Sequence, residues 1–459
     1  MNPQRLEERP AAPLAGDDES VSPLAAAAWH SLAWLLTANA VGVLLAVLLL
    51  FPGLNRELGE WTYGRWMPVH IDLQLYGWCS LPLVAFLMKA YRADEAPAAR
   101  WSRAALWLWS AALTVGALSW LSGHSSGKLF LDWTGYARIV FPLAVAFLWL
   151  LLAWSFFWRW NDAGPSPVLG RAVKTAGLAL LGLVPPILYW SSGTGVYPPI
   201  NPDTGGPTGA SQLESTLVVV AILLMLPFGL DRRKSGSGRW RRIAYAVFAL
   251  EALNCLLLGR GSVSHLQPAQ YLSLSGVLLW APLMPAYYRS FAWPENAKLW
   301  GRAWLCWWAL LTPSGWLLFL PGALDHFKYT DGLVGHALMA MAGFVTSLLI
   351  FVLVTLLGPE NEIFAARWAF ALWQGSTLGY IAIMMIAGWI EGDNPGFSMI
   401  PGTGRNAIYG IRLVLGILMT VATLGWFLRA SRLAGLRRSA LPGRPQREAG
   451  GALTRAKAI

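Results

Sequence analysis

Long apolar runs alternate with short polar segments along almost the whole chain. An apolar run of about 18 to 25 residues is long enough for a helix to cross a bilayer. We find about twelve such runs, at 24–52, 67–91, 102–122, 136–158, 170–190, 211–230, 241–264, 269–290, 299–320, 331–357, 365–390 and 405–429. The pattern predicts an all-α integral membrane protein with a single bundle of about twelve transmembrane helices.

The predicted bundle covers residues 24–430 and leaves two short polar ends. Residues 1–23 are polar and partly acidic, unlike the basic start of a cleaved signal peptide, so we expect the first span to direct insertion. Residues 431–459 form a basic tail that we expect to be disordered. This division predicts one membrane domain and no large soluble domain.

Composition supports the membrane assignment. Hydrophobic residues make up 56% of the chain and charged residues 13%, whereas an ordinary soluble domain has roughly 25% charged residues. A soluble enzyme is therefore excluded. The 27 tryptophans are also typical of a membrane protein, because Trp rings gather at the level of the lipid headgroups. The three cysteines lie in apolar runs and indicate no disulfide framework.

Basic residues predict the orientation. The segment 231–242 carries a net charge of +5 and the tail from Arg429 one of +7, so the rest of the chain adds nothing to the formal net charge of +11, and we expect both segments in the cytoplasm. An even number of spans then places both termini there, and the loop 191–212, which has no Lys or Arg, lies outside. We expect a bacterial inner membrane protein that meets lipid and no nucleic acid.

Three of the six histidines fall near the outer side of the predicted bundle. His70 lies near the start of the second span, His336 near the start of the tenth, and His265 at the end of the seventh. Three histidines from three helices at similar depth is the arrangement that a haem or metal site in a bundle requires. The alternative is that each histidine forms a hydrogen bond between packed helices.

The segments around these histidines resemble a known family. They are GRWMPVHIDLQLYGW around His70, KYTDGLVGHALMAMAGF around His336 and SHLQPAQYLSLSGVLLWAP from Ser264. They resemble subunit I of the haem-copper oxidases, and most closely the C-type cytochrome oxidases and nitric oxide reductases. IAGWIEG from Ile386 and YGIRLVLG from Tyr409 resemble the last two helices of the family. The resemblance implies a twelve-helix fold and an oxidoreductase ancestry.

The resemblance also implies roles for single residues. His70 matches an axial ligand of the low-spin haem, and His336 matches the proximal ligand of the high-spin haem. His265 matches one member of the adjacent histidine pair that binds copper. Leu338 stands where the family has the second low-spin haem ligand, and Ser264 where it has the other copper histidine. The predicted span 211–230, where the family has a third copper histidine, contains none. We therefore expect one or two haem b groups and no copper.

Charged residues complete the set of candidates. Arg65, Arg138 and Arg405 lie at predicted outer ends of spans, where they could bind haem propionates or lipid headgroups. Asp72 and Glu251 lie within predicted spans, where an unpaired carboxylate is costly. Each could belong to a proton relay or act as a neutral acid bonded across the bundle.

Three functional hypotheses follow. The first is a divergent cytochrome c oxidase subunit I-like haem protein that passes electrons in a respiratory chain or binds a gas, with its catalytic activity left open. Its partners would be other respiratory subunits, such as one with a cytochrome or copper domain on the outer face. The second is a twelve-span transporter whose polar path includes His70, Asp72, Glu251 and His336. The third is a haem-free structural subunit of a respiratory complex.

Overall fold

The computed structural model describes residues 21–160, 168–196, 210–236, 238–258 and 266–439. Helices dominate these residues, and the described chain contains no strand beyond one isolated bridge between Lys234 and Phe291. Eight segments of the described chain are long and apolar enough to cross a membrane, namely Pro23–Leu50, Tyr63–Ala90, Ala99–Leu121, Ala137–Trp158, Gly170–Ser191, Asp331–Leu357, Arg367–Asp393 and Thr403–Arg432. The expected all-α fold of a membrane protein is confirmed, and the count of twelve spans stays a prediction.

Helices also occupy the four predicted spans that are not among these eight. These helices are α9 (Ala210–Gly229), α10 (Arg239–Leu258), the broken helix of α11 (Pro268–Leu274), η2 (Ser275–Leu279) and α12 (Trp280–Tyr288), and α13 (Lys298–Phe319). The remaining long helices are α1 (Pro23–Leu50), α5 (Ala99–Leu121), α6 (Ala137–Trp158), α7 (Val168–Gly182), α8 (Val184–Ser191), α17 (Arg367–Asp393) and α18 (Thr403–Ser439). The short α2 (Leu54–Glu57), η3 (Glu295–Ala297) and α14 (Ala323–Phe327) lie in connections.

Two membrane-spanning segments contain a wider, π-helical turn. The first consists of α3 (Tyr63–Asp72), the π-helical η1 (Leu73–Cys79) and α4 (Leu81–Ala90). The second consists of α15 (Asp331–Leu338), the π-helical η4 (Met339–Val345) and α16 (Thr346–Leu357). These two segments carry His70 and His336.

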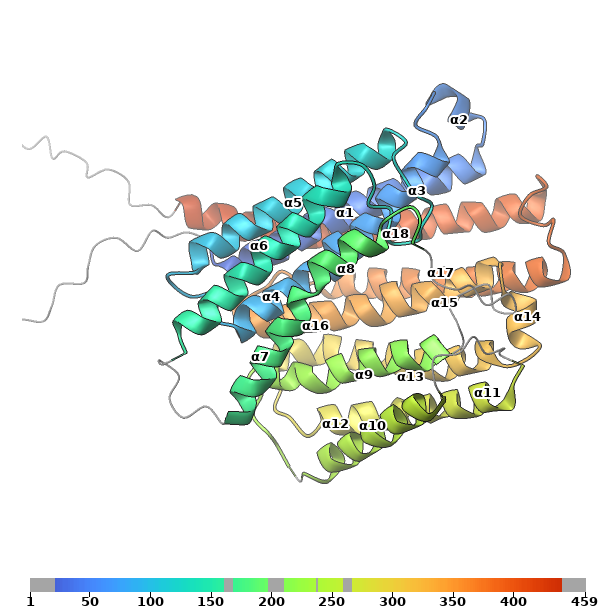
Figure 1. Ribbon diagram of the computed structural model, residues 1–459. Helices are drawn as coiled ribbons and strands as arrows, with labels where there is room; N and C mark the ends of the chain where they lie inside the picture. The colour runs from blue at the N-terminus through green and yellow to red at the C-terminus, as the bar shows by residue number, and fades with distance from the viewer. Residues whose placement is uncertain (1–20, 161–167, 197–209, 237, 259–265, 440–459) are drawn as a thin grey trace, which may run out of the picture.

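The first and last helices lie antiparallel along their whole length (Figure 1). Near one end the Trp29 indole donates to the Ser431 hydroxyl at 3.0 Å, and at the middle the Asn39 amide donates to the Thr423 hydroxyl at 3.0 Å. At the other end Arg405 donates to the carbonyl of Leu49. The chain therefore enters and leaves the bundle at the same end.

That shared end also holds the basic segment 231–242, and we call it the basic end. Lys234 forms an isolated antiparallel β-bridge with Phe291 there, and Arg241 donates to the carbonyl of Ser290.

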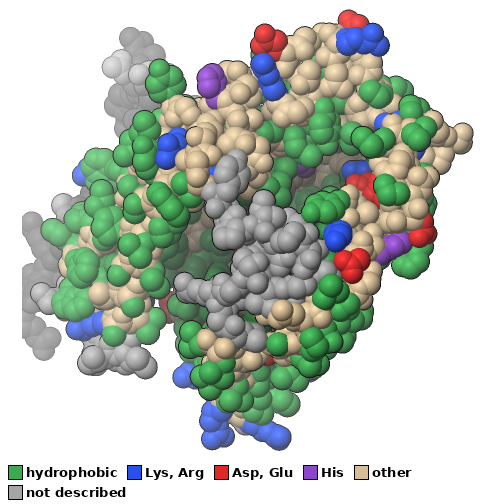
Figure 2. All heavy atoms as spheres, turned by 45° about the vertical axis from the view of Figure 1, so that its right-hand side comes forward, with side chains coloured by type: hydrophobic (Ala, Val, Ile, Leu, Met, Phe, Trp, Pro, Cys, Tyr) green, Lys and Arg blue, Asp and Glu red, His purple; other side chains and the backbone are tan. Residues whose placement is uncertain are grey.

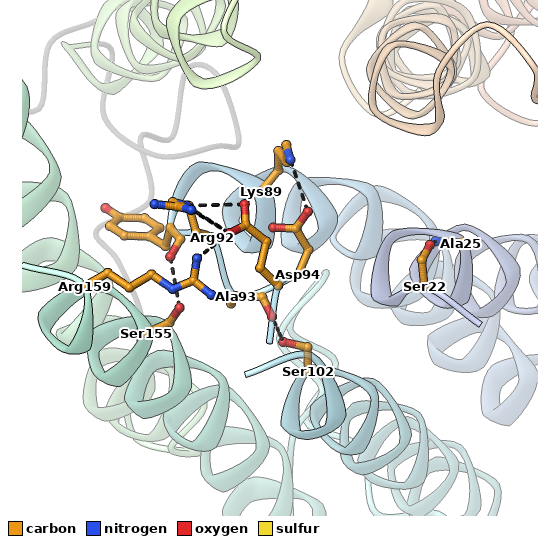
Figure 3. A network of polar contacts seen from close by, with 11 residues as sticks. Ser22, Ala25, Lys89, Arg92, Ala93, Asp94, Ser102, Ser155 and Arg159 are labelled. Atoms are coloured by element: carbon orange, nitrogen blue, oxygen red, sulfur yellow. Dashed lines mark hydrogen bonds and ion pairs between the residues drawn. The ribbon is translucent and has the colours of Figure 1, made fainter. Parts of the chain in front are cut away.

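A polar network around Glu95 lies in the connection between α4 and α5, where Arg92 donates to Glu95 at 2.8 Å (Figure 3). Arg159, at the end of α6, bonds the same carboxylate, so the polar network joins three helices.

Buried tryptophans hold the bundle together. Figure 1 shows the helices side by side, and eight tryptophans, including Trp78 and Trp373, are almost fully buried between them. The Trp78 indole donates to the Thr346 hydroxyl at 3.0 Å, and that of Trp373 donates to the carbonyl of Ala342 at 3.0 Å. The expectation that the tryptophans lie at the level of the lipid headgroups therefore describes only part of them, because many Trp rings connect helices inside the bundle.

Candidate functional site

A cavity of about 1380 Å³ opens at the end of the bundle opposite the basic end. Its walls come from α9, η2, α13, the α15–η4 segment and the end of α17, and its inner part is apolar, with Trp308, Leu311 and Phe344. Asp331 and Glu391 lie on its outer part. Figure 2 has this end turned forward and shows a hollow whose rim carries acidic and basic side chains.

His336 lies on the wall of this cavity. Its Nδ1 atom is 3.4 Å from the Ser314 hydroxyl of α13, and no described residue forms a hydrogen bond with its Nε2 atom. Gly315 keeps the space beside the ring open, because a Cβ atom there would lie 3.4 Å from Nε2. The predicted ligand His336 is therefore accessible from a cavity large enough for a cofactor.

His70 lies elsewhere in the bundle and does not line this cavity. Its Nδ1 atom is 2.7 Å from the carbonyl oxygen of Ala38 in α1. A Cβ atom at Gly42 would lie only 2.6 Å from Cε1, so α1 packs directly on the ring. A carbonyl can only accept, so the neutral ring carries its proton on Nδ1 and keeps the Nε2 lone pair, the arrangement of a metal-binding histidine.

The two histidine segments repeat one local structure. Each histidine is followed three residues later by a π-helical segment of seven residues, a feature that occurs frequently at functional sites. The Ser80 hydroxyl donates to the carbonyl of Leu75 at 2.9 Å, and the Thr346 hydroxyl donates to that of Met341 at the same distance.

Glycines in the two segments also match. Gly77 packs against Trp34 of α1, and Gly343 packs against Trp307 of α13, each closely enough that a Cβ atom would clash. The similarity of the two segments is not evident in the sequence, because few of their side chains match. The shared signal is a histidine followed seven residues later by Gly and ten residues later by a hydroxyl residue.

The two predicted carboxylates are buried in different surroundings. Asp72 is 0% exposed, and neither of its oxygens has a hydrogen-bond partner in the described part of the chain. Glu251 accepts a hydrogen bond from the Trp280 indole at 2.8 Å, while the carbonyl of Trp280 accepts one from the cavity residue Trp308 at 2.7 Å. Glu251 is thus connected to the cavity wall through Trp280, whereas Asp72 lies apart from the cavity.

The three predicted arginines bond backbone carbonyls at the end opposite the basic end. Arg65 donates to the carbonyl of Leu121 and to Glu60, and Arg138 donates to the carbonyl of Tyr189. Arg405 donates to the carbonyls of Ser398 and Leu49. None of the three lines the cavity around His336. These bonds give each arginine a structural role.

The copper position cannot be placed in the bundle. His265 lies outside the described residues, as does Ser264. Among the described residues, no group of three or more His, Cys, Asp or Glu side chains is arranged to hold a metal ion. Leu338 is half-buried and packs against the apolar core.

The structure reveals one ionic cluster that the sequence analysis missed. Arg412, in the first third of α18, forms an ion pair with Asp331 at 2.8 Å, and their side chains are 13% and 19% exposed. Glu391 accepts a hydrogen bond from the backbone N–H of Asp331 at 2.6 Å and another from Ser398. The position of Arg412 inside a predicted span was the available signal, because such a charge needs a partner.

The chain matches no protein-family model, and no curated protein matches it.

Proposed function

We propose that this protein is a divergent member of the haem-copper oxidase subunit I superfamily that binds one haem b through His336. The observation that carries the proposal is the position of His336 on a cavity of about 1380 Å³, with Nε2 unbonded among the described residues. Cavities that enclose a cofactor-sized ligand typically measure about 300 to 1,000 Å³. The residues therefore fit a haem held by one axial imidazole.

A haem bound at this site would supply one-electron redox chemistry and the capacity to bind a diatomic gas. The chain provides the ligand and its surroundings. His336 would bind the iron, Gly315 leaves space beside the ring, and the apolar side chains of Trp308, Leu311 and Phe344 would keep water from the inner part of the cavity. Respiratory electron transfer or gas binding is the proposed activity.

A second haem on His70 has weaker support. The hydrogen bond from His70 to Ala38 orients the ring as a ligand. Leu338, however, cannot ligate iron, and α1 packs against the His70 ring. We therefore propose one haem as the minimum content. A copper centre is not part of the proposal, because only His265 remains of the copper ligands implied by the resemblance.

We also propose an orientation and partners. The basic end lies in the cytoplasm together with both termini, and the cavity opens toward the outer face of a bacterial inner membrane. A respiratory subunit with a cytochrome or copper domain on that face would deliver electrons. A reporter enzyme that is active only in the cytoplasm, fused after residue 459, is expected to be active, and an inactive fusion would contradict this orientation.

The test of the proposed function is spectroscopic. Protein purified in detergent from haem-supplied cells should show a Soret band, a haemochrome ratio of about one per chain and a shift with carbon monoxide. His336→Ala should lose these features. His326→Ala is the matched control, because His326 also lines the cavity but bonds the carbonyl of Trp389, and it should retain haem.

Transport is a second candidate, favoured by the ionic cluster on the cavity wall. Asp331 and Glu391 line the cavity, and Arg412 within a predicted span pairs with Asp331; polar and charged groups of this kind are typical of ion pathways. A colourless wild-type protein from haem-supplied cells would contradict the haem proposal and leave transport through this cluster as the hypothesis to test. Proton or cation flux into liposomes would then be measured for the wild type and for Glu391→Gln.

A further inference from the structure

The hydroxyl group of Ser314 lies between α13 and the ring of His336. Its Oγ atom is 2.7 Å from the carbonyl oxygen of Leu310, one turn earlier in the same helix, and 3.4 Å from Nδ1 of His336. A serine has one hydroxyl hydrogen. The carbonyl oxygen of Leu311 is a second acceptor at 3.1 Å, and the shorter contact with Leu310 is the better use of that hydrogen. With its hydrogen on either carbonyl, Ser314 has only lone pairs to offer the histidine.

Met339 offers the Ser314 hydroxyl only a distant acceptor. Its Sδ atom lies 3.6 Å from the same Oγ atom, and a thioether has no hydrogen to donate. With the hydroxyl hydrogen of Ser314 directed at a backbone carbonyl, a hydrogen bond between Oγ and Nδ1 of His336 requires the hydrogen on Nδ1. A neutral imidazole that donates from Nδ1 keeps its lone pair on Nε2.

We propose that Ser314 is a positioning residue that holds His336 in the tautomer with the proton on Nδ1. Nε2 then carries the lone pair, beside the space that Gly315 leaves open at the cavity wall. The tautomer assignment concerns the polypeptide alone. Its consequence for iron binding rests on the proposed function.

The repeated structure around His70 supports the assignment independently. There the acceptor is the carbonyl of Ala38 at 2.7 Å, which fixes the proton on Nδ1 because a carbonyl cannot donate. In both cases the neighbouring helix supplies an acceptor for Nδ1 and a glycine beside the ring, Gly42 in α1 and Gly315 in α13. The two helix pairs present their histidines in the same way.

The tautomer can be measured in the full-length chain without haem. The chain has six histidines, so ¹³C,¹⁵N-histidine labelling gives few signals, and His336→Gln identifies the signal of interest. Nitrogen–carbon correlations at a pH where the ring is neutral should show His336 protonated mainly on Nδ1. A ring protonated mainly on Nε2 would overturn the inference.

Two variants separate positioning from a merely structural role. Ser314→Ala should turn the Nδ1–H form of His336 from the major into a minor population, and Ser314→Thr, which keeps a hydroxyl, should restore it. The signal of His70 should be unchanged in both variants, because its acceptor is a backbone carbonyl. An unchanged His336 signal in Ser314→Ala would refute the role of Ser314.

A measurement on haem-loaded protein distinguishes this inference from the proposed function. The iron–histidine stretching band of the ferrous protein should move to lower frequency in Ser314→Ala, because a donated Nδ1–H strengthens the imidazole as a ligand. An unshifted band in a haem-containing protein would overturn the positioning role. If the wild type binds no haem, the proposed function fails, and the tautomer measurement alone decides the inference.

Discussion

The ion pair between Arg412 and Asp331 should be among the strongest single interactions outside the apolar core. The N–O distance is 2.8 Å, and the side chains are 13% and 19% exposed, so solvent screens the pair weakly. Removing one partner of a buried pair typically costs about 3 to 5 kcal/mol, because the remaining charge loses its counter-ion. We expect Arg412→Met to destabilise the fold by an amount in this range.

A double-mutant cycle measures the pair itself. Arg412→Met and Asp331→Asn are made singly and together, and unfolding is followed by Trp fluorescence during titration with sodium dodecyl sulfate in mixed micelles. A hydrogen bond between charged groups contributes about 1.5 to 3 kcal/mol, so the coupling energy should fall in that range. The control is the pair of Lys298 and Glu295, which is 48% and 86% exposed and should couple by less than about 1 kcal/mol.

Equal coupling energies for the two pairs would refute the reasoning, since burial would then confer no advantage. The result also bears on the candidate site. Asp331 is the first residue of α15, and His336 follows five residues later in the same short helix. If the ion pair anchors this helix, Arg412→Met should also weaken haem binding by His336.

Three further predictions test other parts of the structure. Leu338→His should add a low-spin haem spectrum that disappears when His70→Ala is also introduced, if the resemblance places these positions correctly. Gly42→Ala should lower the unfolding midpoint and cost about 1 to 3 kcal/mol, because its Cβ atom would lie 2.6 Å from the His70 ring. Hydrogen bonds from Arg92 lower the pKa of Glu95, so Glu95 stabilises the fold above its ordinary pKa, and this contribution is lost as pH falls through the lowered value. The midpoint difference between wild type and Glu95→Gln should therefore stay constant from pH ~7 down to the ordinary Glu pKa of about 4.3 and shrink as the pH falls further.

The positions of the helices could be predicted from the sequence because an apolar run of sufficient length has few other stable structures in a membrane. All twelve predicted spans contain helix in the described chain, although the segment from Pro268 to Tyr288 is interrupted by η2. The π-helical segments after Asp72 and Leu338 could not be predicted, because apolar periodicity does not distinguish a π turn from an α turn.

The candidate site was predictable in part. His336 was found because an imidazole inside an apolar run is unusual, and the structure places it on the cavity wall. The roles of Arg65, Arg138 and Arg405 could not be read from sequence, because the backbone carbonyls that they bond depend on loop conformation. Ser314 gave no signal, since a single serine in an apolar helix is common and its importance comes from packing against another helix.

Because α1 packs against α18, the first helix cannot complete its contacts until the last helix has been synthesised. The hydrogen-bond acceptor of the Asn39 amide in α1 is the hydroxyl of Thr423, which follows it by 384 residues. At about 5 to 20 residues per second, the ribosome needs roughly 20 to 80 s to deliver that partner. Until then the nascent bundle has an open seam along its first helix. We expect chaperones and cofactor-delivery factors to reach the interior through this seam before the last helix closes it, and a chain truncated before α18 to remain open to them.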